Sequence, residues 1–138
     1  MSDPALSSNG RETFAARFLS AEGRLGRRGF LVSALVLLAV AVIYDAVSSG
    51  ALQWITGWLV WPLLVWIGAC LLARRLHDRG HNGWIAAVIL AAVVGVWPQP
   101  TGFLDFPLVL VLVWAAIELG LMVGEPGVNR YGPPPPGG

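Results

Sequence analysis

The chain has 138 residues, of which 56% are hydrophobic and only 12% are charged, with a formal net charge of +1. The charged share is about half that of a typical soluble domain, so the composition argues against a soluble globular fold and favours helices that face lipid. The length predicts a single domain.

The first 29 residues precede the first long apolar run. Residues 1–9 are rich in Ser, Asp and Asn and are predicted to be disordered. Apolar side chains then recur at helical spacing at Phe14, Phe18, Ala21 and Leu25. This pattern predicts a short amphipathic helix from about residue 10 to 21, lying in the headgroup plane, with a frayed tail as the alternative. Glycines and arginines up to residue 29 form an elbow that turns the chain into the bilayer.

Four nearly uncharged apolar runs follow, and we predict that each is a transmembrane helix. They cover 30–49, 54–73, 84–98 and 103–123. A helix of 20 residues is about 30 Å long, which matches the hydrocarbon layer of a bilayer. The first run is too long, and too far from the N-terminus, for a cleaved signal peptide. The expected fold is therefore an all-α membrane domain over 30–123, followed by a Pro/Gly-rich tail at 124–138.

The arginines predict the orientation of these four spans. They occur at 11, 17, 24, 27, 28, 74, 75, 79 and 130, whereas the loops 50–53 and 99–102 contain none. Cytoplasmic loops of membrane proteins retain basic residues, so both termini are expected in the cytoplasm. Orientation alone explains the arginines, and nucleic acid is not an expected partner.

Three motifs in this chain resemble those of a known family. They are FLSAEGRLGRRGF from Phe18 to Phe30, RRLHDRGHNGW from Arg74 to Trp84, and GVNRYGP from Gly127 to Pro133. In this order they are similar to the motifs of the small bacterial inner-membrane proteins called domain of unknown function 805. Leu31 and Asn82 stand where that family usually has Trp and Ser. The resemblance implies a multi-pass protein of the bacterial inner membrane and implies no activity.

The predicted topology gathers the polar residues of all three motifs at the cytoplasmic face. This layer comprises Arg24, Arg27, Arg74, Arg75, His77, Asp78, Arg79, Asn129, Arg130 and Tyr131. Asp78 lies at helical i+3 and i+4 spacing from Arg75 and Arg74, so either pair can form. One interpretation is structural, with Asp78 tying the second span to the elbow or to Arg130. A second is recognition of an anionic headgroup, phosphorylated ligand or acidic segment by the surplus guanidinium groups.

A third interpretation, catalysis by His77 with Asp78, is disfavoured because adjacent helical side chains point about 100° apart. His77 and His81 have a spacing that can bind zinc, but two ligands are too few, so no metal or other cofactor is expected. Cys70, inside an apolar run, is expected to be a packing residue. No catalytic residues are assigned, and the protein is expected not to be an enzyme.

Two acids, Asp45 and Glu118, lie within predicted spans, where a carboxylate is unfavourable by about 2.5–3.5 kcal/mol at mid-bilayer. Their depths differ by roughly 15 Å, so they do not form a pair. We expect Glu118 to reach Arg74 or Arg28 instead.

The leading hypothesis is a non-enzymatic protein whose cytoplasmic layer holds helix ends together and binds anionic lipid or an acidic partner. The alternative is a small transporter or channel subunit that uses Asp45 and Glu118. A membrane-protein partner or a homo-oligomer remains open, through Trp54 to Trp61 or through Gly120 and Gly124.

Overall fold

The computed structural model describes residues 19–97, 102–103 and 105–135. The predicted disordered segment 1–9 and most of the predicted interfacial helix lie outside these residues. The helix does not continue through residues 20 and 21, because residues 20–26 form an irregular elbow. Gly23, with φ +80°, adopts the left-handed backbone conformation that the elbow requires.

The prediction of an all-helical fold is confirmed for the described residues. The helices are α2 (Arg27–Val47), α3 (Gly50–Asp78), α4 (Ile85–Val96) and α5 (Asp105–Ala115), the last continued by a π-helical segment, η2 (Ala116–Leu121). There is no strand in this part of the chain, only an isolated bridge between Asn129 and Gly132. Of the described helices, α2 and α3 are long and apolar enough to cross a membrane.

The helix ends differ from the predicted spans. α2 begins three residues before residue 30, and α3 includes residues 50–53, which were predicted to be a loop. α3 also continues past residue 73 to Asp78, and Pro62 lies inside it. α4 has only 12 residues. Helix α5 has only 11 residues before the π-helical turn takes over.

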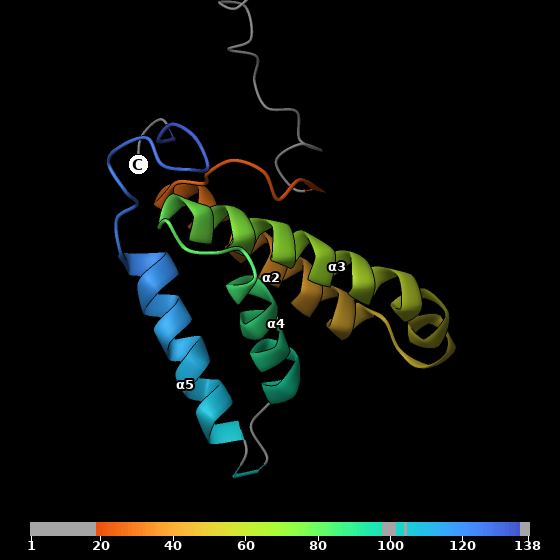
Figure 1. The fold of residues 1–138 in the computed structure, drawn as a ribbon. Coiled ribbons are helices and arrows are strands. Elements are labelled where there is room, and N and C mark those ends of the chain that lie inside the picture. Colours follow the sequence, from red (N-terminus) through yellow and green to blue (C-terminus); the bar gives the residue numbers. More distant parts are fainter. Residues whose placement is uncertain (1–18, 98–101, 104, 136–138) are drawn as a thin grey trace, which may run out of the picture.

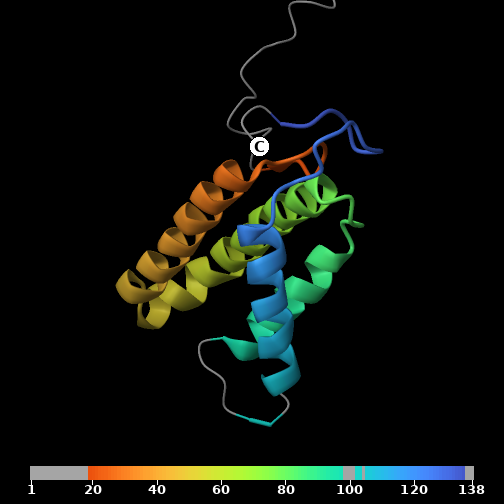
Figure 2. The same cartoon turned by 90° about the vertical axis from the view of Figure 1, so that its left-hand side faces the viewer.

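The four helices form two hairpins that meet at one end and diverge at the other. Figures 1 and 2 show the hairpin α2–α3 running obliquely to the hairpin α4–α5. We call the end where they meet the closed end, and it contains the start of α2, the last turns of α3, the start of α4 and η2. The tips of the hairpins form the open end. The chain segments that follow Leu19 and η2 both lie at the closed end.

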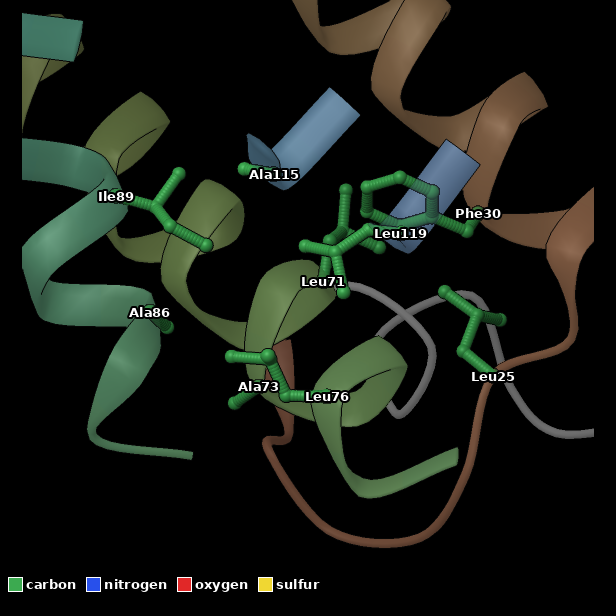
Figure 3. Packing of buried hydrophobic residues seen from close by; sticks show 9 residues of the cluster. All are labelled: Leu25, Phe30, Leu71, Ala73, Leu76, Ala86, Ile89, Ala115 and Leu119. Atoms are coloured by element: carbon green, nitrogen blue, oxygen red, sulfur yellow. The ribbon is translucent and has the colours of Figure 1, made fainter. Parts of the chain in front are cut away.

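The buried apolar core also lies at the closed end (Figure 3). Its members come from the elbow and from every helix: Leu25, Phe30, Leu71, Ala73, Leu76, Ala86, Ile89, Ala115 and Leu119. Away from this core the helices expose large apolar side chains, for example Trp58 at 79% and Ile55 at 77%. Such continuous apolar exposure is unfavourable in water and favourable in lipid.

A backbone motif ends α3 and directs the chain toward α4. The N–H of Gly80 donates to the carbonyl of His77 (3.1 Å), and the N–H of His81 donates to that of Leu76 (2.8 Å). Together with the φ of +71° at Gly80, these bonds form a Schellman C-cap.

Candidate functional site: a buried arginine layer

Asp78 lies at the centre of the closed end and pairs with two arginines. Nε of Arg24 donates to one carboxylate oxygen of Asp78 at 3.0 Å, and a guanidinium nitrogen of Arg75 donates to the other. The side chains of Arg24, Arg75 and Asp78 are 1%, 0% and 2% exposed. Asp78 therefore joins the second span to the elbow, as the structural interpretation expected. In the structure its second partner is Arg75.

Backbone carbonyls take up most of the remaining donors of these two arginines. Arg24 donates to the carbonyls of Glu125 (2.5 Å), Gly127 (2.6 Å) and Gly132 (3.3 Å). Arg75 donates to those of Leu119 (2.8 Å), Met122 (2.5 Å) and Leu25 (3.5 Å). The last carbonyls of a helix have no partner inside the helix, and a nearby cation satisfies them. Arg75 thus caps the end of η2, and Arg24 fixes the C-terminal segment.

The same contacts explain how one carboxylate suffices for two buried cations. α3 and η2 both end at the closed end, and the C-terminus of a helix carries a partial negative charge of roughly half an elementary charge. These helix ends supply the compensation that a second acid would otherwise provide. The donors of Arg24 and Arg75 are engaged within the protein, which does not fit the recognition role that the sequence left open for them.

Glu118 pairs with Arg79, whereas the sequence pointed to Arg74 or Arg28. Nε and Nη2 of Arg79 donate to the same oxygen of Glu118 at 3.0 and 2.8 Å. Nη1 of Arg79 also donates to the carbonyl of Val123. Glu118 belongs to η2, where the wider π-helical turn changes the direction of side chains relative to an α-helix. The depth of Glu118 in its predicted span pointed to the cytoplasmic rim but did not determine which arginine it would meet there.

His77 holds the C-terminal segment by its ring and its backbone. The rings of His77 and Tyr131 stack at 3.8 Å with an interplanar angle of 9°, and the guanidinium of Arg130 lies 4.8 Å from the Tyr131 ring centroid. Nδ2 of Asn129 donates to the carbonyl of His77 at 2.9 Å. Burial lowers the pKa of His77 below its usual value, and the charge of Arg130 acts in the same direction. A neutral, stacked imidazole is a packing element here.

The structure places the other predicted residues in different surroundings. Arg27 is exposed and donates to the carbonyl of Leu121 at 3.2 Å, and Arg28 is exposed. Arg74 is buried, and its carbonyl accepts a bond from Leu25 N–H at 3.2 Å. His81 contacts the carbonyl of Arg79 through Nδ1. Among the described residues no group of three metal-binding side chains occurs.

Asp45 lies near the open end, far along α2 from the arginine layer. Its carboxylate accepts a hydrogen bond from Nε2 of Gln53 at 3.3 Å. Next to it, the hydroxyls of Tyr44 and Thr56 are 2.8 Å apart and join α2 to α3. Asp45 and Glu118 therefore have separate local partners. Cys70 is buried, in agreement with a packing role.

Gly80, Gly124 and Glu125 also help to build the site, although the sequence did not identify them as site residues. A Cβ on Gly124 would lie 2.0 Å from the Asp78 carboxylate, and a Cβ on Gly80 would lie 2.4 Å from that of Glu125. The N–H of Glu125 donates to the carbonyl of Asp78 at 2.9 Å. The spacing of Gly120 and Gly124 had indicated close helix approach; Gly120 lies against Leu31 of α2, whereas Gly124 follows η2 and covers Asp78.

Fold and site together define a class: a small all-helical protein with lipid-compatible apolar hairpins, joined at one end by buried arginines. A family model described as "Protein of unknown function (DUF805)" matches residues 18–133. The chain belongs to this family, as the three motifs indicated.

Three relatives show how far the likeness extends. The "Uncharacterized protein YiiR" of Escherichia coli strain K12, and that of strain O157:H7, are 33% identical over 82% of this chain and 84% of the relative. A "Lipoprotein signal peptidase" of Pseudomonas fluorescens is 31% identical over 81% of this chain and 66% of the relative. No solved structure matches.

Proposed function

We propose that this protein is a non-enzymatic, four-span protein of the bacterial cytoplasmic membrane, with both termini in the cytoplasm. The observation that carries the proposal is the position of the arginines. Every arginine in the described residues belongs to the elbow, the start of α2, the end of α3 or the C-terminal segment, all at the closed end. With α2 and α3 as spans, basic residues on one side only predict a cytoplasmic closed end.

Within this layer we assign two separate tasks. The buried Arg24 and Arg75 hold helix ends together through Asp78 and the backbone carbonyls. The exposed Arg27 and Arg28 face the headgroup region at the start of α2, where no acidic residue accompanies them. A basic residue near an anionic leaflet contributes about 1 kcal/mol, so the pair should favour anionic lipid by about 2 kcal/mol. Anionic lipid is therefore the proposed partner of the exposed arginines.

The peptidase name of one relative does not lead us to propose hydrolysis. Asp45 and Asp105 are the described acids nearest the open end. Asp45 lies near the end of α2, and Asp105 begins α5. These two helix ends belong to the tips of hairpins that diverge in both views (Figures 1 and 2). Carboxylates that share a proton must lie about 3 Å apart, which this arrangement does not favour.

Transport is likewise not our proposal. The transport hypothesis rested on the two acids, Asp45 and Glu118, that lie within predicted spans. Glu118 forms an ion pair with Arg79, and Asp45 accepts a hydrogen bond from Gln53. A carboxylate that is already paired is a poor candidate for carrying a proton or an ion.

The test is lipid binding to delipidated protein in mild detergent, followed by native mass spectrometry. We expect the wild type to bind phosphatidylglycerol in preference to phosphatidylcholine. The double variant Arg27→Gln, Arg28→Gln should weaken phosphatidylglycerol binding by about 30-fold, which corresponds to about 2 kcal/mol. The matched control Arg27→Lys, Arg28→Lys retains the charge and should retain the preference. Equal binding of both lipids by the wild type would refute the lipid-binding proposal.

A further inference from the structure

The hairpin α4–α5 is much shorter than a bilayer is thick. α4 has 12 residues, Ile85–Val96, with no charged side chain. In α5 and η2 the stretch between the acids Asp105 and Glu118, residues 106–117, also has 12 uncharged residues. Twelve helical residues rise about 18 Å, whereas the hydrocarbon layer of a typical bilayer is about 30 Å thick.

Polar and aromatic residues mark both ends of this short apolar stretch. At the closed end, Trp84 is 80% exposed and precedes α4, while Glu118 is paired with Arg79. At the open end, Phe103 is 90% exposed and Asp105 begins α5. A carboxylate is strongly disfavoured in hydrocarbon, and indole rings prefer the membrane–water interface. The hairpin is thus bounded on both sides by groups that belong outside the hydrocarbon.

Tilting cannot correct this mismatch. A tilted helix spans less depth than an upright one, so tilt only helps a helix that is too long. α3 is such a helix, because its uncharged stretch from Gly50 to Ala73 would rise about 36 Å. Figures 1 and 2 show the hairpin α2–α3 oblique to the hairpin α4–α5. An orientation that holds α4 and α5 upright therefore tilts α2 and α3, and both hairpins then suit a thin hydrocarbon layer.

The outward faces of the short hairpin are apolar along its whole length. In α4, Val88 is 57% and Val94 63% exposed, and in α5, Leu110 is 53% and Val113 50% exposed. Acyl chains that cover these side chains must end near Phe103 and Trp84, because hydrocarbon beyond them would meet Asp105 or the arginine layer. Lipid adapts to a short span by local thinning.

We propose that the α4–α5 hairpin thins the bilayer around it, drawing the outer leaflet inward toward Phe103, and that its apolar surface prefers lipids with short acyl chains. The inference rests on the membrane orientation given under Proposed function. To the proposed function it adds short acyl chains as a lipid partner. It places them on the outer-leaflet side of the α4–α5 hairpin.

Single cysteines at the two hairpin tips test this geometry. Phe103→Cys and Ser49→Cys are made in a Cys70→Ala background and reconstituted in dimyristoleoyl-, dioleoyl- and dierucoyl-phosphatidylcholine, in order of increasing chain length. A membrane-impermeant maleimide reports exposure, relative to total labelling after solubilisation. Cysteine at position 103 should label well in the shortest lipid and several-fold less in the longest, whereas cysteine at position 49 should label equally in all three.

The two positions separate the failure of this inference from the failure of the orientation. If the Ser49→Cys thiol reacts from the outside in intact spheroplasts but labelling at position 103 ignores chain length, the thinning proposal is wrong. If the Ser49→Cys thiol does not react from the outside, the orientation itself is wrong, and the thinning proposal falls with it.

A measurement on the unmodified protein covers the case in which the cysteine variants do not fold. Wild-type protein is reconstituted in an equal mixture of the shortest and longest lipids and extracted with its neighbouring lipids in polymer-bounded discs. We expect the short lipid to be enriched several-fold over the bulk mixture. Equal proportions in the discs and the bulk would overturn the proposal.

Discussion

Replacing Asp78 by Asn should be one of the most damaging single substitutions in this protein. The carboxylate of Asp78 is the acid that Arg24 and Arg75 share, and all three side chains are at most 2% exposed. Asn keeps the size of the side chain and removes its charge. Two buried guanidinium groups would then have only neutral partners, chiefly the backbone carbonyls of η2 and of the C-terminal segment.

Removing one partner of a buried ion pair costs about 3–5 kcal/mol, because the remaining charge stays buried. Whole proteins are stable by only about 5–15 kcal/mol, so this loss would be a large share of the total. We expect Asp78→Asn to lower the free energy of unfolding by about 3–5 kcal/mol. Unfolding by SDS in mixed micelles, followed by tryptophan fluorescence and far-ultraviolet circular dichroism, measures it.

Glu125→Gln is the matched control, because it makes the same chemical change at an exposed position of the same end. Its carboxylate accepts a bond from Asn129 at 2.8 Å and contacts no buried cation in the described structure. The expected cost is below about 1 kcal/mol, as for other exposed polar contacts. A loss below 1 kcal/mol for Asp78→Asn as well would refute the view that this carboxylate compensates the arginine layer.

Three further experiments probe the rest of the layer. Burial lowers the pKa of His77, so the unfolded chain takes up a proton at this residue before the folded chain does, as the pH falls below about 6.5. The midpoint temperature of thermal unfolding should therefore decrease between pH 7 and 5. The decrease should be less steep in His77→Gln. Gly80→Ala should cost about 1 kcal/mol, measured by SDS unfolding, because an L-residue is strained at φ +71°. A double-mutant cycle of Arg79→Ala and Glu118→Gln should give a coupling energy of about 1–2 kcal/mol; a value near zero would show that this partly exposed pair is not a stabilising contact.

The helices could be predicted from the sequence, and their arrangement could not. Long apolar runs between charged or Gly-rich segments leave few alternatives to helices. The divergence of the hairpins depends on where the core lies, which is set by contacts between distant residues such as Phe30, Leu71 and Leu119. No local pattern in a nearly uniform apolar sequence distinguishes a core-facing side from a lipid-facing one.

In the site, too, local spacing predicted some contacts, and contacts between distant residues could not be predicted. The i, i+3 spacing identified Arg75 and Asp78 as a potential pair, because it follows from helix geometry alone. Arg24 is 54 residues from Asp78; the predicted topology brought the elbow to Asp78, and only the fold shows that Arg24 is the residue of the elbow that pairs with it. The partner of Glu118 was missed because depth along the bilayer places several arginines within reach, and only the fold selects Arg79. The carbonyl partners of the arginines carry no side-chain signature and were invisible in the sequence.

The carbonyl contacts of Arg24 and Arg75 have a consequence for biosynthesis. Leu119 and Met122, whose carbonyls accept from Arg75, and Glu125, whose carbonyl accepts from Arg24, all follow both arginines in the sequence. A product that terminates before Leu119 lacks these acceptors, so burying its two guanidinium groups would leave donors without partners. Closure of the arginine layer is therefore the last step that a growing polypeptide can complete.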